Sequence, residues 1–145
     1  SRNRFAGLGC GFWLRRSVFH QVGGISEDLT MNEDTDFSLK MMSQGYEPLY
    51  SRIAGVSLYI GDRVSLTKSA KARSRADCFQ KILQRHENFL QSNPDAMSFV
   101  MQRFLKHAGR ARMFQPGVRA ANSGATLGQK ARNHLIFAAN AIRGE

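Results

Sequence analysis

The sequence has few of the residues that would indicate a metal centre, a disulfide framework or a membrane span. Its two cysteines, Cys10 and Cys78, lie far apart and match no metal-ligand spacing. A reducing, cytosolic compartment is therefore expected. No run approaches the roughly 18 to 20 consecutive apolar residues that a bilayer-spanning helix needs, and no charged-then-apolar leader opens the chain. Any contact with a membrane should be peripheral.

Acidic residues are scarce only in the second part of the chain. Residues 1–64 carry seven Lys or Arg and seven Asp or Glu, whereas residues 65–145 carry fourteen and four. The whole formal net charge of +10 therefore belongs to the second part. This composition favours partners that carry phosphate, such as nucleic acid, sugar nucleotides or anionic lipid. The change in charge predicts a boundary between 1–64 and 65–145.

Short mixed elements are expected in the first part. A short helix is predicted over 15–22, ended by a glycine pair, and a second over 35–44. Two runs of apolar, β-branched and aromatic residues between glycines, 48–53 and 56–60, predict short strands. The fold class expected for this part is α/β.

The basic part is expected to be mostly helical. Apolar residues that advance by alternating steps of four and three predict amphipathic helices over 68–91 and 97–108. Breaker residues at 93–95 and 115–117 end these helices. A third, weaker helix is predicted over 126–143. Its expected apolar face comprises Leu127, Ala131, Leu135, Ala138 and Ile142.

Three carboxylates stand within four residues at the expected start of the second helix: Glu33, Asp34 and Asp36. Such crowding is unfavourable unless it is offset, and the unpaired N–H groups and positive dipole end of a helix N-terminus offset it in part. Helix capping alone would account for such a cluster, and Thr30 with Glu33 has the spacing of a capping box. The surrounding sequence favours a chemical role.

Four segments follow one another in order: 9–16 (GCGFWLRR), 22–27 (VGGISE), 33–37 (EDTDF) and 45–48 (GYEP). This string resembles the second half of bacterial family-two glycosyltransferases of GT-A type. In that family a glycine-bearing strand ends in paired Arg residues, a short helix leads to a Val-Gly-Gly turn, and a Glu-Asp pair starts the next helix. The resemblance implies a partial GT-A-type (nucleotide-diphospho-sugar transferase) segment in the first part, and it fades beyond residue 65.

The function that the resemblance implies is transfer of a sugar from a nucleotide-sugar donor to an acceptor hydroxyl, with inversion. By position the resemblance assigns the general base to Asp34, with Glu33 beside it and Asp36 in support. The chemistry is consistent with a carboxylate there, because a hydroxyl attacks an anomeric carbon well only when its proton is removed during the attack.

The triplet at 34–36 also has the letter pattern of the Asp-x-Asp metal motif of these enzymes. In the family that motif ends an earlier strand, whereas this triplet follows the Val-Gly-Gly turn and opens a helix, so no metal ligand is expected in this chain. Where many relatives place a metal- or diphosphate-binding His, residues 58–60 are Leu, Tyr and Ile. A divalent ion, Mg²⁺ or Mn²⁺, would belong to the full-length enzyme with its donor-binding N-terminal half.

Several further residues are candidates for substrate contacts. Cations at the entry to the first long helix could offset charge on the leaving diphosphate, although a solvated basic face explains any single one at least as well: Arg63 and Lys68 above all, with Lys71, Arg73 and Arg75. Trp13 could stack against an acceptor sugar, with burial in the core as the equal alternative. Gly11 could let the backbone pass close to the acceptor, and simple strand irregularity is the plainer account.

Two other functions fit the basic helices. A nucleic-acid binding module is less favoured, because the phenylalanines mostly follow the apolar faces instead of interleaving with the cations. Amphipathic, Lys/Arg-rich helices could also dock on an anionic membrane surface or on partner subunits of a polysaccharide-assembly system. A transferase of this kind would be cytoplasmic and peripheral at the inner face of the plasma membrane, with a glycan or lipid-linked acceptor. Because the chain begins without Met inside what the resemblance treats as one folded unit, it is expected to be a fragment that is inactive alone.

Overall fold

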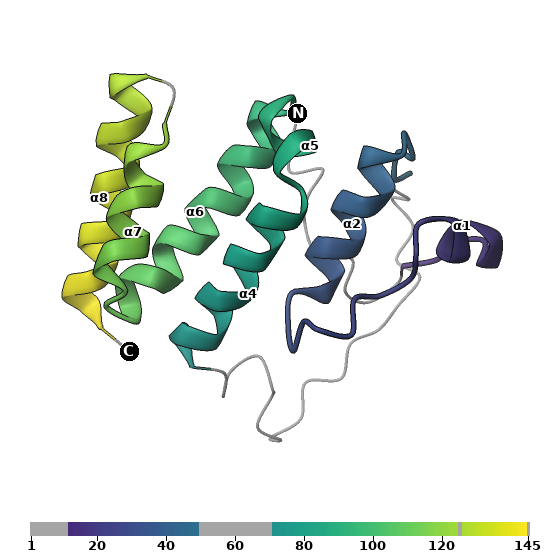
Figure 1. The fold of residues 1–145 in the computed structure, drawn as a ribbon, viewed down its shortest axis with the longest axis horizontal. Helices are drawn as coiled ribbons and strands as arrows, with labels where there is room; N and C mark the ends of the chain where they lie inside the picture. The colour runs from purple at the N-terminus through teal and green to yellow at the C-terminus, as the bar shows by residue number, and fades with distance from the viewer. Residues whose placement is uncertain (1–11, 50–70, 125, 145) are drawn as a thin grey trace. The chain divides into compact units, whose positions relative to one another are not determined.

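The computed structural model describes residues 12–49, 71–124 and 126–144, and seven helices form there (Figure 1). Contacts along the chain divide it into two compact units, Ser1–Ser65 and Leu66–Glu145. This division lies one residue beyond the point where the charge composition changes. Unit 1 and unit 2 therefore correspond closely to the neutral and the basic parts of the sequence.

The described part of unit 1 contains helices α1 (Arg16–Gln21) and α2 (Glu33–Ser43). Both lie where the sequence predicts them, within two residues at each end. After α1 the chain reverses through Gly23 and Gly24, whose φ angles of +81° and +62° are left-handed values that glycine adopts without steric cost. This reversal brings the chain back to pack α2 against α1.

A small aromatic core joins these two helices. Phe37 of α2 is 2% exposed and packs with Val22 and Met41. The Phe19 ring of α1 lies 5.6 Å from the Phe37 ring, centroid to centroid. Phe12 and Tyr46 pack against the same cluster from either end of the described segment. All four segments that carry the family resemblance therefore contribute to one packed cluster.

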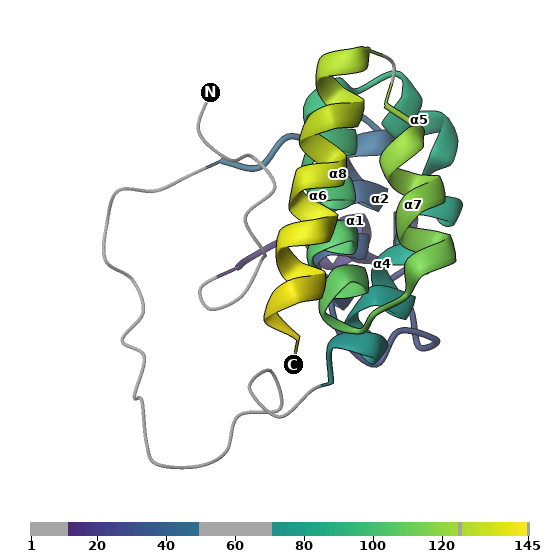
Figure 2. The ribbon, with the colours of Figure 1, turned by 90° about the vertical axis from the view of Figure 1, so that its left-hand side faces the viewer.

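Unit 2 is a helical bundle built around α6 (Pro94–Arg110). On one side α6 packs against α4 (Ala72–Arg85) and the short α5 (Glu87–Gln91), and it also contacts α7 (Phe114–Asn122) and α8 (Leu127–Arg143). Figures 1 and 2 show α8 lying along α6, with α7 beside both. The buried face of α6 repeats at steps of four and three, as an amphipathic helix requires. Its fully buried members include Ala96, Val100, Phe104, Leu105 and Ala108.

Of the five helices of unit 2, α4, α6 and α8 correspond to predicted helices, α5 lies at the end of the first of these predictions, and α7 is not predicted. The predicted helix over 68–91 is interrupted at His86, which separates α4 from α5, and its first residues lie outside the described part. The predicted break at 115–117 is wrong, because those residues form the first turn of α7. Proline is tolerated there, since the first turn of a helix has no acceptor for its missing N–H.

Two glycines explain how α7 and α8 pack. A Cβ atom at Gly117 of α7 would overlap the ring of Phe137, and one at Gly109 of α6 would lie 2.5 Å from the Phe137 carbonyl oxygen. Phe137 itself is 5% exposed. The backbones of α6 and α7 therefore approach α8 closely only because no side chain stands at these two positions.

The predicted apolar face of α8 is not the buried one. Leu127, Leu135 and Ile142 are 86%, 71% and 86% exposed, whereas Phe137, on another face, is buried. The error has a physical cause, because one large aromatic ring fitted between two glycines decides which side of α8 faces α6 and α7. A count of apolar residues per face does not reveal that fit.

The expected α/β fold class is wrong. The described residues contain helices and no strand. Of the two predicted strands, 48–53 and 56–60, only Pro48 and Leu49 are described, and they are irregular; the remainder lies outside the described residues. β-Propensity expresses how a side chain fits a paired, half-buried strand, so a short apolar run predicts a strand only where a neighbour completes its backbone hydrogen bonds.

Candidate functional site

The three carboxylates at the start of α2 lie in different environments. Asp36 is fully buried, its Oδ2 accepts a hydrogen bond from the Ser26 hydroxyl at 2.5 Å, and Lys40 lies 3.6 Å from the same oxygen. Lys40 also donates to the carbonyl of Gly24 at 3.0 Å. Asp36 thus connects α2 to the loop after the Val-Gly-Gly turn. Its role is structural.

Asp34 is half-buried and is held by its own helix. Its Oδ1 accepts the backbone N–H of Thr35 at 2.7 Å and contacts the Thr35 hydroxyl at 3.4 Å. Among the described residues, Oδ2 of Asp34 has no hydrogen-bond or ion-pair partner. One carboxylate oxygen therefore satisfies a first-turn amide, as helix capping requires, and the other remains available as a proton acceptor.

Glu33 is exposed at the first position of α2. The expected capping box between Thr30 and Glu33 is wrong, because the residue that precedes the helix is Asn32 and its side chain makes no capping bond. Asn32 has a left-handed φ of +60°, a conformation that Asn tolerates better than most residues.

The other expected substrate contacts divide between described and undescribed parts of the chain. The side chain of Trp13 is 87% exposed, so it is not part of the packed core of the described residues. Gly11, Arg63 and Lys68 lie outside the described residues. The structure therefore describes Trp13 among the contacts proposed for the acceptor, and only the further candidates Lys71, Arg73 and Arg75 among those proposed for the diphosphate.

The histidines occupy helix faces or helix ends. His20 is exposed on α1, and His134 of α8 hydrogen-bonds the Asn122 side-chain oxygen at 2.8 Å. His107 is buried in α6 and stacks on Phe79 of α4, with the ring planes 3° apart. Burial, followed by the nearby charges of arginines and of Lys106, lowers the pKa of His107 from 6.5 to about 4. His107 is therefore a neutral packing residue.

In the described part of the chain, no group of three His, Cys, Asp or Glu side chains is placed to hold a metal ion. None of the described helices combines the length and the apolar character that crossing a bilayer would require.

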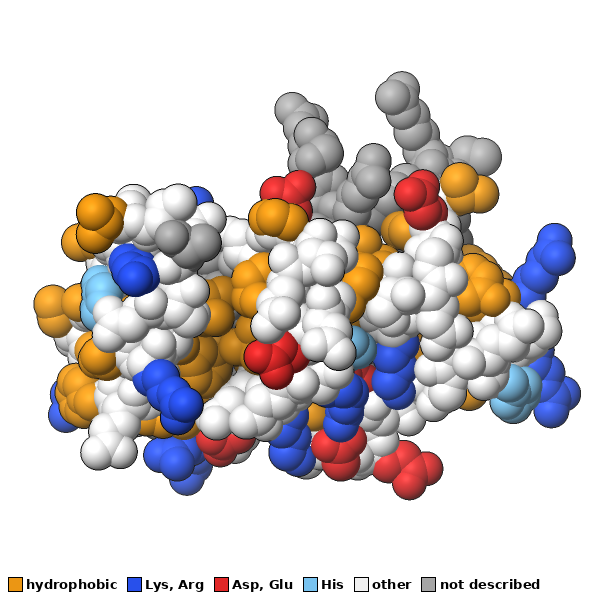
Figure 3. Space-filling view, turned by 45° about the horizontal axis from the view of Figure 1, so that its top comes forward, with side chains coloured by type: hydrophobic (Ala, Val, Ile, Leu, Met, Phe, Trp, Pro, Cys, Tyr) orange, Lys and Arg blue, Asp and Glu red, His pale blue; other side chains and the backbone are white. Residues whose placement is uncertain are grey.

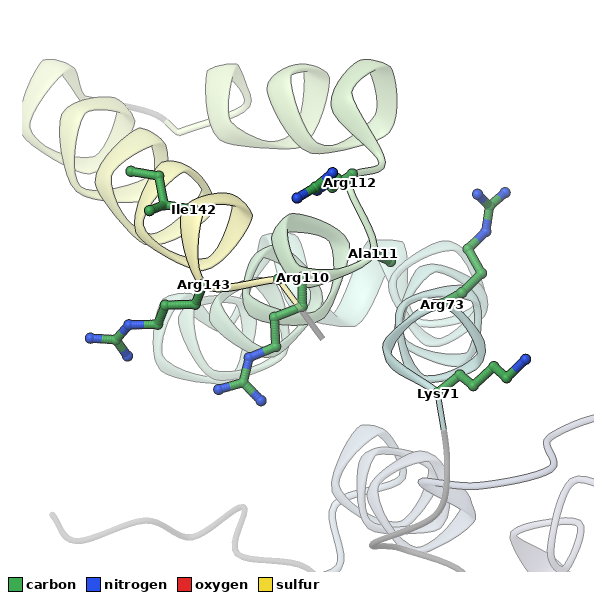
Figure 4. Close-up of a pocket in the computed structure, with 8 residues that line it drawn as sticks. Lys71, Arg73, Arg110, Ala111, Arg112, Ile142 and Arg143 are labelled. Atoms are coloured by element: carbon green, nitrogen blue, oxygen red, sulfur yellow. The ribbon is translucent and has the colours of Figure 1, made fainter.

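Unit 2 contains an open hollow that sequence reasoning did not identify. Its volume is about 580 Å³, and five of the residues that line it are cationic. Arg110 and Arg143 extend in the same direction from the ends of α6 and α8, whereas Lys71 and Arg73 extend from the start of α4 toward another side (Figure 4). The lining residues are Lys71, Arg73, Arg110, Ala111, Arg112, Ile142, Arg143 and Gly144.

The cations of this hollow differ in how they are paired. Arg73 lies 3.4 Å from Asp77, one turn further along α4, and both side chains are at least half exposed. The Nε atom of Arg110 is buried and has no hydrogen-bond partner among the described residues. Arg110 and Arg143 each occupy the last turn of their helix, α6 and α8. The sequence shows these two basic helix ends, but only the fold shows that they lie close together.

Comparison of the chain with protein-family models, with curated proteins and with solved structures found no match.

Proposed function

We propose that the chain is the acceptor-side part of a glycosyltransferase that transfers a sugar from a nucleotide-sugar donor to an acceptor hydroxyl. The observation that supports this proposal most is that the carboxylates of Asp34 and Asp36, two residues apart, have different environments. Asp36 is buried and bound to Ser26 and Lys40, while Asp34 keeps one oxygen without a partner among the described residues. Helix capping accounts for only one oxygen of Asp34.

In the proposed reaction, Asp34 accepts the proton of the acceptor hydroxyl as that oxygen attacks the anomeric carbon of the donor. The new glycosidic bond forms on the face opposite the departing nucleoside diphosphate, which leaves with the electrons of the broken bond. This displacement inverts the anomeric configuration. Glu33 is placed beside the base, and the exposed Trp13 is available to stack against the acceptor ring.

The packing of unit 1 gives the proposal a second support. The four segments that resemble the family are separated in sequence, and residues from each of them, Phe12, Val22, Phe37 and Tyr46, meet in one cluster. Their spacing is therefore tied to one folded unit that holds the start of α2. A chance sequence likeness would not require the segments to pack together.

The test is an assay of the complete enzyme with a panel of nucleotide sugars and acceptors, in which Asp34→Asn is compared with Glu33→Gln. Asn keeps the oxygen that accepts the Thr35 N–H and removes the proton acceptor, so turnover should fall by about 10²- to 10⁴-fold. The Glu33→Gln variant should retain far more activity. A complete enzyme that transfers sugar equally well with Asn at position 34 would exclude the proposed base.

A nucleic-acid binding module receives less support from unit 2. Phe79 and Phe104 are 3% and 2% exposed, so neither ring is available to stack on a base. Phe99 is half-buried, and the guanidinium of Arg103 lies 3.5 Å from the centre of its ring. Binding of single strands relies on exposed aromatic rings between cations.

A further inference from the structure

Helix α8 presents a line of aliphatic side chains to solvent. Leu127, Leu135 and Ile142 are largely exposed, and Ala131 and Ala138 lie between them on the same side of the helix. These five residues are named the α8 stripe. An apolar face of this length that stays exposed beside the described helices of its own unit marks an interaction surface.

The charged side chains of α7 and α8 themselves, Phe114–Asn122 and Leu127–Arg143, are all basic. From Ala96 to Gly144 the sequence contains no Asp or Glu and eight Lys or Arg. At 100° per residue, Arg132 and Arg143 flank one edge of the stripe, and Lys130 flanks the other. Over α7 and α8, at the left of Figure 3, hydrophobic and basic side chains lie next to one another.

The basic hollow adjoins one end of the α8 stripe. Ile142, the last residue of the stripe, lines the hollow together with Arg110, Arg112 and Arg143 (Figure 4). None of these three arginines forms an ion pair among the described residues. With a volume of about 580 Å³, the hollow is large enough for a phosphate headgroup. Ile142 of the stripe and three cations therefore line the same hollow.

We propose that the α8 stripe and its flanking cations dock unit 2 on an anionic lipid bilayer. The aliphatic side chains insert below the headgroups, and the arginines bind lipid phosphates. A second copy of the chain fits less well, because pairing two acid-free faces brings like charges together. Nucleic acid fits less well, because the stripe has no aromatic side chain to stack on a base. The proposal does not depend on glycosyl transfer.

The test is co-sedimentation of the 145-residue chain with vesicles of phosphatidylcholine alone and with vesicles containing 30% phosphatidylglycerol. The wild-type chain should partition at least tenfold more strongly onto the anionic vesicles, and added salt should reduce that preference. The double variant Leu135→Ser, Ile142→Ser should bind the anionic vesicles at least tenfold more weakly, since it removes inserted apolar surface. Arg132→Gln with Arg143→Gln should remove most of the preference for anionic lipid.

Matched controls lie away from the stripe. Leu49 of unit 1 is 99% exposed, more than either Leu135 or Ile142, so Leu49→Ser is the control for the single variants Leu135→Ser and Ile142→Ser and should leave vesicle binding unchanged. Lys81→Gln removes a cation from α4 and should have a much smaller effect than the arginine pair. Circular dichroism should show equal helix content in all variants, because each replaced side chain is exposed.

Three results would overturn the proposal. A wild-type chain that binds neutral and anionic vesicles equally, or binds neither, would contradict it. So would a serine double variant that binds as well as the wild type. Dimerisation that occurs without lipid and is abolished by the same double variant would assign the stripe to a second copy instead.

Discussion

His107 connects stability to pH at the scale of a single residue. The unfolded chain protonates this imidazole near pH 6.5, whereas the folded chain does so only near pH 4, because the ring is buried among arginines and Lys106. The stability that neutral His107 contributes is complete above pH 6.5 and is lost as the pH falls toward 4. From the size of this shift, the loss should be at most roughly 3 kcal/mol.

Urea denaturation followed by circular dichroism at pH 7 and pH 4.5 measures this effect. Carboxylates also titrate near the lower pH, so the informative quantity is the difference between the wild type and His107→Gln. The variant should be less stable at pH 7, where the stacking on Phe79 is altered, and its stability should depend less on pH. Equal pH dependence in both proteins would show that His107 is not held neutral.

A second prediction for a single residue concerns the space beside Gly117. A methyl group there would overlap the Phe137 ring, so Gly117→Ala should lower the free energy of unfolding by about 1–3 kcal/mol or more. Gly128 of α8 is the matched control, since a Cβ atom there meets only the Thr126 hydroxyl at 4.0 Å. Gly128→Ala should be neutral or stabilising by up to about 1 kcal/mol. Equal effects of the two substitutions on thermal unfolding would contradict the packing described for Phe137.

The candidate site shows what residue spacing can and cannot predict. The sequence places three carboxylates at the start of α2, and the structure has them there. It does not reveal that Asp36 is buried against Ser26 and Lys40 while Asp34 retains an oxygen without a partner among the described residues. Those differences depend on how the loop after Gly24 folds back. Such long-range contacts leave no periodic signal in the sequence.

At the scale of elements, α8 has the one complete capping box found at the start of a described helix. The Thr126 hydroxyl accepts the Gln129 N–H at 3.1 Å, and the Gln129 side chain accepts the Thr126 N–H at 3.3 Å. Thr126→Ala should destabilise the chain by about 1 kcal/mol, measured by thermal unfolding. Thr126→Ser keeps the hydroxyl and should restore most of that loss. If Ser and Ala behave alike, the box contributes no stability.

The helices that the sequence predicts best are those whose apolar periodicity matches their packing. In α4 and α6 the predicted apolar positions Ala76, Phe79, Val100 and Phe104 are buried. In α8 the periodic residues form the exposed stripe, and the fit of Phe137 between two glycines determines the buried side. Periodicity therefore predicts that a helix forms. It does not identify which face packs when a single ring controls the contact.

At the scale of the whole molecule, charge composition predicted more than fold class did. The change from a neutral to a basic composition coincides, within one residue, with the division into two compact units. The α/β prediction is wrong, because the described residues form helices and no strand. The net charge of a long segment does not depend on where its helices and strands are predicted. Fold class, by contrast, depends on contacts between distant segments.

We propose that two carboxylates two residues apart have separate roles, Asp34 in chemistry and Asp36 in folding. The most direct measurement determines both the sugar-transfer rate and the melting temperature of the complete enzyme for Asp34→Asn and Asp36→Asn. We expect Asp34→Asn to lose about 10²- to 10⁴-fold in turnover with little change in melting temperature. Asp36→Asn should lower the melting temperature, because it weakens a buried contact with Lys40. Full turnover in Asp34→Asn, or a melting temperature that falls with Asp34→Asn and not with Asp36→Asn, would contradict the claim.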